Sequence, residues 1–120
     1  MSKILLIDDM PSVRGAIAAV LRKDGHEVVE AEDGHSGLER ARESRFDLVI
    51  TDIMMPNSDG TDVVFALKEQ AGSPPVIAMS GGGSGIPAET ALTLARSTAD
   101  AALTKPFENA ELLDAVGQLT

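Results

Sequence analysis

The sequence contains no cysteine, no tyrosine and no tryptophan, and only three phenylalanines among its 120 residues. The absence of cysteine excludes disulfides, thiolate metal sites and a cysteine nucleophile. Because aromatic residues are scarce, a core must be built from Val, Ile, Leu, Met and Ala, which the hydrophobic content of 43% allows. The length predicts a single domain, residues 1–120.

Long apolar runs and a surplus of basic residues are also missing. No stretch approaches the roughly 18 apolar residues of a membrane helix, and the run Ile4–Ile7 is shorter than a signal-peptide core. We therefore expect a cytoplasmic protein without membrane insertion. The 19 acidic residues outnumber the 10 basic ones, and the net charge of −9 would repel a nucleic acid backbone. Direct binding of nucleic acid is not expected.

Short apolar runs alternate with segments of helical periodicity, which is typical of an α/β chain with a parallel sheet. Five strands are predicted, at Lys3–Ile7, His26–Ala31, Leu48–Thr51, Pro75–Met79 and Ala101–Leu103. Five helices are predicted: from Pro11 and Ser12 to Gly25, at Ser36–Ser44, after Gly60, from about Pro87 to Ser97, and at Asn109–Leu119. Right-handed crossovers would place the helices on both faces of a doubly wound sheet.

The periodicity also predicts which side chains are buried. The first helix should turn inward Val13, Ala16, Ile17, Val20 and Leu21, and the second should bury Leu38 and Ala41. Both histidines, His26 and His35, are expected at the surface. The glycine-rich run 80–85 is predicted to be a loop. It lacks the lysine and hydroxyl ending of a P-loop and the spacing of a dinucleotide-binding motif, which disfavours a nucleotide site.

Polar residues follow four of the five predicted strands: Asp8 and Asp9, Asp52, Ser80, and Lys105 with Pro106. The ends of these strands share one edge of the sheet, where ligands bind in such folds. Three crowded carboxylates repel one another, so the arrangement indicates a hard divalent cation, most naturally Mg²⁺. A hydroxyl and a lysine could then contact phosphate oxygens, and a carboxylate can itself accept a phosphoryl group.

Each of these residues also has a purely structural interpretation. Asp8 and Asp9 could cap the helix that opens near Pro11, and Asp52 could start the turn that follows it. Ser80 and Lys105 could be ordinary loop residues. The occurrence of such residues after four of the five predicted strands favours a common site over independent accidents.

The segments around these residues resemble the receiver domains of two-component response regulators, in order and over essentially the whole chain. They are Ile4–Asp9, Leu48–Pro56 with Asp59–Gly60, Met79–Ser80 and Leu103–Phe107. The resemblance implies a flavodoxin-like receiver fold with strand order 2-1-3-4-5, of the stand-alone type represented by the chemotaxis regulator.

The resemblance also implies a role for each residue. Asp52 would be the phosphorylated aspartate, Asp8 and Asp9 its partners in Mg²⁺ binding, Met54 a backbone carbonyl ligand, Ser80 the switch hydroxyl, and Lys105 the phosphate-contacting lysine before a cis proline, Pro106. The implied partners are a sensor histidine kinase or a histidine phosphotransfer protein and a downstream protein target, with the chain itself a monomer. The implied chemistry is limited to self-catalysed phosphotransfer and autodephosphorylation, so the chain is not expected to be an enzyme in the usual sense.

Two departures from the family pattern concern signalling. Ala102 stands where such domains usually have a switch aromatic residue, and the loop after Ser80 is glycine-rich and a few residues longer than usual. A pseudo-receiver that binds a partner without phosphorylation is therefore a remaining alternative. An aspartyl-phosphate hydrolase of the haloacid-dehalogenase kind is disfavoured, because its second acid, two residues after the nucleophile, corresponds to Met54 here.

Overall fold

The computed structural model describes residues 2–52, 54–55, 58–59, 66–67, 69, 73–80, 99–104 and 107–120. Its main sheet has five parallel strands, β1 (Lys3–Ile7), β2 (Glu27–Ala31), β3 (Leu48–Asp52), β6 (Val76–Ser80) and β7 (Ala101–Thr104). The strand order is β2-β1-β3-β6-β7. Since β6 and β7 are the fourth and fifth predicted strands, the predicted order 2-1-3-4-5 and the fold class are confirmed.

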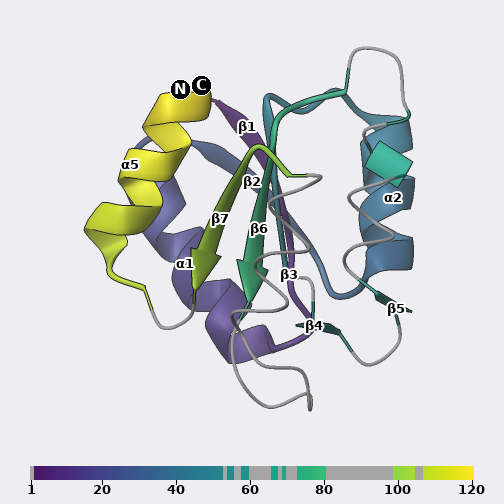
Figure 1. The fold of residues 1–120 in the computed structure, drawn as a ribbon, viewed down its shortest axis with the longest axis horizontal. Helices are drawn as coiled ribbons and strands as arrows, with labels where there is room; N and C mark the ends of the chain where they lie inside the picture. The colour runs from purple at the N-terminus through teal and green to yellow at the C-terminus, as the bar shows by residue number, and fades with distance from the viewer. Residues whose placement is uncertain are drawn as a thin grey trace.

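Helices cover both faces of this sheet, as Figure 1 shows. The helices α1 (Pro11–Lys23) and α5 (Asn109–Leu119) lie on one side and α2 (Gly34–Glu43) on the other. Residues 66, 67 and 69 are also helical, and they fall within the helix predicted after Gly60. The helix predicted from about Pro87 to Ser97 lies outside the described residues.

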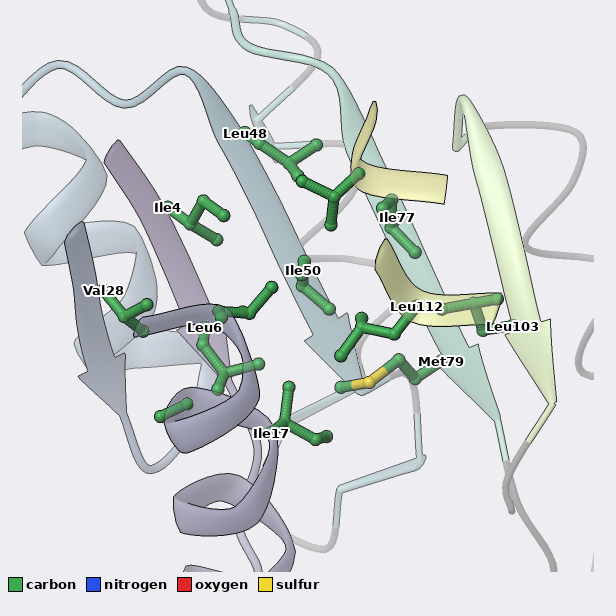
Figure 2. Packing of buried hydrophobic residues seen from close by; sticks show 13 residues of the cluster. Ile4, Leu6, Ile17, Val28, Leu48, Ile50, Ile77, Met79, Leu103 and Leu112 are labelled. Atoms are coloured by element: carbon green, nitrogen blue, oxygen red, sulfur yellow. The ribbon is translucent and has the colours of Figure 1, made fainter. Parts of the chain in front are cut away.

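Two apolar cores result from the alternation of side chains along each strand. On one face Leu6, Ile50 and Met79 pack against Ile17 of α1 and Leu112 of α5, and Figure 2 shows these side chains converging from the sheet and the two helices. On the other face the intervening strand residues pack beneath α2; the buried members of this second cluster are Leu5, Ile7, Ala31, Phe46, Val49, Leu67 and Val76. Strands buried on both faces explain the uninterrupted apolar runs in the sequence.

The first helix begins and ends close to its predicted limits. Pro11 is its first residue and Met10 its N-cap, and among the described residues no side chain caps it. At the other end the N–H of His26 donates to the carbonyl of Leu21, and the N–H of Gly25 to that of Arg22, which closes a Schellman motif. Gly25 has a φ of 94°, a conformation that favours glycine.

Some details of the helices differ from the predictions. Ala16 is exposed and Ala18 is buried in its place, because the inward stripe of α1 runs through Ile17, Ala18 and Leu21. The second helix begins at Gly34 and not at Ser36, since the side chain of Asp33 caps it by accepting the N–H of Ser36 at 2.7 Å. Leu38 and Ala41 are only partly buried against the second cluster.

The prediction for one histidine was wrong. The His26 side chain is only 10% exposed. Its Nδ1 accepts the N–H of Ser2 at 3.1 Å, and its Nε2 lies 3.3 Å from a carboxylate oxygen of Asp24. His35 is 84% exposed, as predicted. The burial of His26 depends on the neighbouring N-terminal segment and could not be inferred from local sequence.

The strand ends are aligned across the sheet by its register. Ile7 pairs with Thr51, Thr51 with Ala78, and Ala78 with Ala102. A short antiparallel pair, β4 (Met54–Met55) with β5 (Ser58–Asp59), follows β3 at the edge toward which the strands point (Figure 1). Residues directly after Ile7 and Thr51 therefore become lateral neighbours.

Candidate metal and phosphoryl-acceptor site

Asp8 and Asp52 occupy equivalent places on neighbouring strands. Each follows one member of the Ile7–Thr51 pair, and adjacent strands are about 4.8 Å apart. Leu6 and Ile50, two residues earlier, belong to the same core cluster, so the alternation directs both aspartates to the same side of the sheet. The parallel register itself thus brings the two carboxylates together.

Asp9 completes a group of three carboxylates. One oxygen each from Asp8, Asp9 and Asp52 lies within 4.8 Å of the other two. Asp8 is fully buried and Asp52 is 5% exposed, whereas Asp9 is half-buried. Carboxylates so close together in a buried place repel one another unless cations compensate their charge. The group therefore has the composition and spacing of a site for a hard cation.

These oxygens fit the requirements of Mg²⁺. The ion takes oxygen ligands at about 2.0–2.1 Å, so ligands on opposite sides of it are about 4.2 Å apart. The spread of up to 4.8 Å in the group is close to this span. Protein sites for Mg²⁺ use one or two carboxylates directly and leave other positions to water and phosphate oxygens.

The turn from β1 into α1 is fixed by hydrogen bonds to Asp8. Its main-chain N–H donates to the carbonyl of Ala31 at 3.1 Å, and its Oδ1 accepts the N–H of Met10 at 3.0 Å. The carbonyl of Asp8 accepts a bond from Nη1 of Arg14 at 2.7 Å. The interpretation of Asp8 and Asp9 as caps of the first helix was wrong. The N–H that Asp8 accepts belongs to Met10, the residue before that helix, and among the described residues no side chain caps the helix.

Asp52 ends a strand in which every residue is buried. The preceding Thr51 is fully buried, and its hydroxyl donates to the carbonyl of Asp52 at 3.1 Å. In the ladder with β6, Asp52 pairs with Met79. The acceptor candidate is consequently held by regular sheet structure.

The other predicted site residues are only partly within the described structure. Ser80 is the last residue of β6, and its backbone pairs with that of Thr104 in β7. It follows Met79, the partner of Asp52 in the ladder. The backbone of Met54 begins β4. Lys105 and Pro106 lie outside the described residues, as do the side chains of Ser80 and Met54.

Two further residues next to the site were not identified from the sequence. Arg14 contacts both the carbonyl of Asp8 and the carboxylate of Glu30, with its Nε 3.2 Å from Oε1. Glu30 also pairs with Arg22, whose Nη1 lies 3.3 Å from Oε2. The only signal was an arginine one helical turn after the helix start, and such residues are usually solvated.

The absence of the usual aromatic residue is visible in the sheet. Ala102 is half-buried in β7 and pairs with Ala78, a second small residue. No ring can therefore be present at this position of the edge strand.

Comparisons with known proteins agree with this architecture. Residues 4–117 match the family model of the response regulator receiver domain. The sensory transduction protein RegX3 of Mycolicibacterium smegmatis is 35% identical over 113 residues, which are 94% of this chain and 48% of that protein. The transcriptional regulatory protein CpxR of Escherichia coli is 36% identical over 113 residues, 94% of this chain and 47% of that protein. The chain thus spans about half the length of these curated relatives.

Solved structures show the same fold over nearly full lengths. The chemotaxis protein CheY4 of Vibrio cholerae superposes with a TM-score of 0.85 at 29% identity, covering 100% of this chain and 99% of that one. The receiver domain of the Francisella response regulator 1452 has a TM-score of 0.85 at 30% identity, covering 99% and 96%. Among the described residues, none of the helices combines the length and apolar character needed to cross a membrane. With a sheet of the expected order, an acidic group at its edge and a family match over 4–117, this chain belongs to the receiver domains of two-component response regulators.

Proposed function

We propose that Asp52 accepts a phosphoryl group from a phosphohistidine of a sensor histidine kinase or of a histidine phosphotransfer protein, with Mg²⁺ held by Asp8, Asp9 and Asp52. The observation that supports this most directly is the convergence of the three carboxylates to within 4.8 Å at the end of β1 and β3. A group of three acids that also matches the receiver family is best explained by a cation and a phosphoryl group. The whole chain, residues 1–120, would act as one such domain in the cytoplasm.

The transfer needs little from the protein beyond position and charge compensation. A carboxylate oxygen of Asp52 attacks phosphorus, the bond from phosphorus to the imidazole nitrogen breaks, and an acyl phosphate forms on Asp52. Bound Mg²⁺ would neutralise negative charge that develops on the phosphoryl oxygens. Asp52 is suited to the attack because the sheet fixes its direction while its carboxylate stays at the rim of the core.

The remaining roles rest on the family resemblance and on the sheet register. The backbone carbonyl of Met54 would complete the ion's ligands, and Ser80 and Lys105 would contact phosphoryl oxygens, with Pro106 in the cis form. The pairing of Asp52 with Met79 and of Ser80 with Thr104 supports this, because it puts the backbone of Ser80 and of Thr104 at the same edge of the sheet as Asp52. Hydrogen bonds to a dianionic group are among the stronger ones in proteins.

Phosphorylation would then change a protein-binding surface, which a downstream protein target recognises. A new dianion at the sheet edge favours whichever conformation supplies more contacts to it. Ala102 implies that this response does not use a buried ring at that position of β7. The net charge of −9 argues against direct nucleic acid binding, and we propose that the chain acts as a monomer.

The test is to incubate the protein with acetyl phosphate and Mg²⁺ and to measure its mass. The wild type should gain one phosphoryl group, which chelation of Mg²⁺ and the variant Asp52→Asn should each prevent. Asp47→Asn is a suitable control, because Asp47 is an exposed aspartate that precedes the same strand and should leave labelling unchanged. Absence of labelling in the wild type, or equal labelling of Asp52→Asn, would contradict the proposal. Absence of labelling in the wild type, together with partner binding that the phosphodonor does not change, would favour a pseudo-receiver.

A further inference from the structure

Arg14 connects the acidic group to the second strand. Its Nη1 donates to the main-chain carbonyl of Asp8 at 2.7 Å, while its Nε donates to Oε1 of Glu30 at 3.2 Å. The Arg14 side chain is 17% exposed and that of Glu30 is 31% exposed, so both groups are largely removed from water. A charge-assisted bond to a main-chain carbonyl at this distance is stronger than an ordinary neutral one.

We propose that Arg14 is a positioning residue that sets the direction of the Asp8 and Asp9 carboxylates for Mg²⁺. This inference rests on the proposed function of the site. The carbonyl of Asp8 belongs to the peptide unit between Asp8 and Asp9, and a peptide unit is planar, with both Cα atoms in its plane. Fixing that carbonyl therefore fixes the position of the Asp9 Cα and the direction of the N–Cα bond about which its side chain can turn.

The contact of Arg14 adds to two other restraints on Asp8. The N–H of Asp8 is bound to Ala31 and its Oδ1 accepts the N–H of Met10. The first bond holds the main chain on the N-terminal side of the Asp8 Cα, and the second holds the residue before the helix. The bond from Arg14 holds the Asp8–Asp9 peptide unit between them. Residues that orient metal ligands in this way typically change metal affinity by about 10–100-fold when they are altered.

A guanidinium group suits this position better than an ammonium group. Its donors lie in one rigid plane, so Nε can bind Glu30 while Nη1 binds Asp8. Glu30 is itself held from its other side by Arg22, through Nη1 at 3.3 Å. A lysine at residue 14 would keep the charge and lose the two-point geometry.

The charge of Arg14 alone would have the opposite effect on the ion. A cation near the acidic group repels Mg²⁺, so if only charge mattered, removing it would tighten binding. The ion pair with Glu30 partly offsets this charge. Geometry and electrostatics therefore predict changes of opposite sign for the same substitution.

Arg22 provides a matched control. It is an arginine of the same helix, it pairs with the same carboxylate, and its Nη2 donates to the main-chain carbonyl of Val28 at 3.0 Å. Arg22 contacts Glu30 and Val28, whereas Arg14 contacts Glu30 and Asp8. Arg22→Lys thus perturbs the same ion-pair network away from the acidic pair.

The experiment measures Mg²⁺ affinity by isothermal titration calorimetry for the wild type, Arg14→Lys, Arg14→Ala and Arg22→Lys. We expect about tenfold weaker binding for both Arg14 variants and binding close to that of the wild type for Arg22→Lys. In the metal-free proteins, amide hydrogen exchange of Met10, whose N–H is bound to Asp8 Oδ1, should be faster in both Arg14 variants and unchanged in Arg22→Lys. Urea unfolding establishes that each variant is folded.

Wild-type affinity in Arg14→Lys, tighter binding in Arg14→Ala, or an equal loss in Arg22→Lys would each overturn the role of Arg14. If the wild type itself bound no Mg²⁺, the proposed function of the site would fail. The exchange of the Met10 amide in the metal-free variants would still decide whether Arg14 orders the acidic turn.

Discussion

Gly37 of α2 lies against Ile7 of β1 so closely that a Cβ at position 37 would be 2.7 Å from Cγ1 of Ile7 and closer still to its Cδ1. Both residues are buried, and Ile7 immediately precedes Asp8. The absence of a side chain on Gly37 therefore allows α2 to approach the strand that leads into the acidic group.

We predict that Gly37→Ala destabilises the protein by about 1–3 kcal/mol, the usual cost of overpacking a core. The clash involves the end of the Ile7 side chain, so the same substitution should cost less in an Ile7→Val background, where Cδ1 is absent. Urea unfolding of the two single variants and the double variant measures this coupling.

Gly15→Ala is the control, because a Cβ at Gly15 of α1 would meet no atom within 4 Å. At this exposed helical position alanine should stabilise the protein by up to about 1 kcal/mol. A Gly37→Ala variant that is stabilised to the same degree would show that α2 is free to move away from β1.

The cap of α2 gives a prediction about acid stability. Asp33 accepts the N–H of Ser36, and this hydrogen bond lowers the pKa of the Asp33 carboxyl group below its ordinary value of 3.8. A carboxyl group with a lowered pKa in the folded state stabilises the protein above the unfolded pKa, and this contribution is lost as the pH falls through the folded pKa. Asp33→Ala should cost about 1 kcal/mol at neutral pH.

The variant Asp33→Asn separates the cap from its titration, because asparagine also caps helices but does not ionise. The difference in unfolding free energy between wild type and Asp33→Asn should be constant at neutral pH and shift against the wild type once the pH falls below 3.8. Chemical denaturation at a series of pH values measures it. Parallel curves for the two proteins down to full protonation would contradict the assignment.

Much of the fold could be predicted because buried parallel strands are uninterrupted apolar runs. The predicted Lys3–Ile7 strand agrees with β1, and the predicted Asn109–Leu119 helix agrees with α5. The convergence of Asp8 and Asp52 followed from the rule that parallel strands end at one edge, and the register confirms their adjacency. Composition and periodicity were sufficient to assign these strands, because a strand buried on both faces has an uninterrupted apolar sequence that few other elements share.

The features that were missed depend on contacts between distant segments. The two-residue strands β4 and β5 are too short to have a periodicity and exist through main-chain pairing with each other. His26 is covered through its contact with Ser2, 24 residues away. The bond from Arg14 to Asp8 uses a main-chain acceptor, which every residue possesses, so no residue type could indicate it. The start of α2 was missed although it depends on local sequence alone, since Asp33 before the helix is a recognisable cap.

Asp9 has a half-buried carboxylate, one oxygen of which lies within 4.8 Å of oxygens from Asp8 and Asp52. Asp9→Asn removes like-charge repulsion from the metal-free protein and one candidate ligand from the metal-bound protein. Allowing for its partial exposure to water, we expect about 1 kcal/mol of stabilisation in EDTA, equivalent to about 4 °C in Tm. In Mg²⁺ at 100 times the Kd, the free energy of unfolding of the wild type should rise by about 2.7 kcal/mol. That of the variant should rise by only a small part of this amount. The order of the two melting temperatures, followed by circular dichroism, should therefore reverse between EDTA and Mg²⁺.

Asp114→Asn, which removes one exposed charge from α5, should melt in parallel with the wild type under both conditions. If Asp9→Asn kept the full response to Mg²⁺, Asp9 would not be a ligand; if it were less stable in EDTA, the three carboxylates would not be in electrostatic conflict.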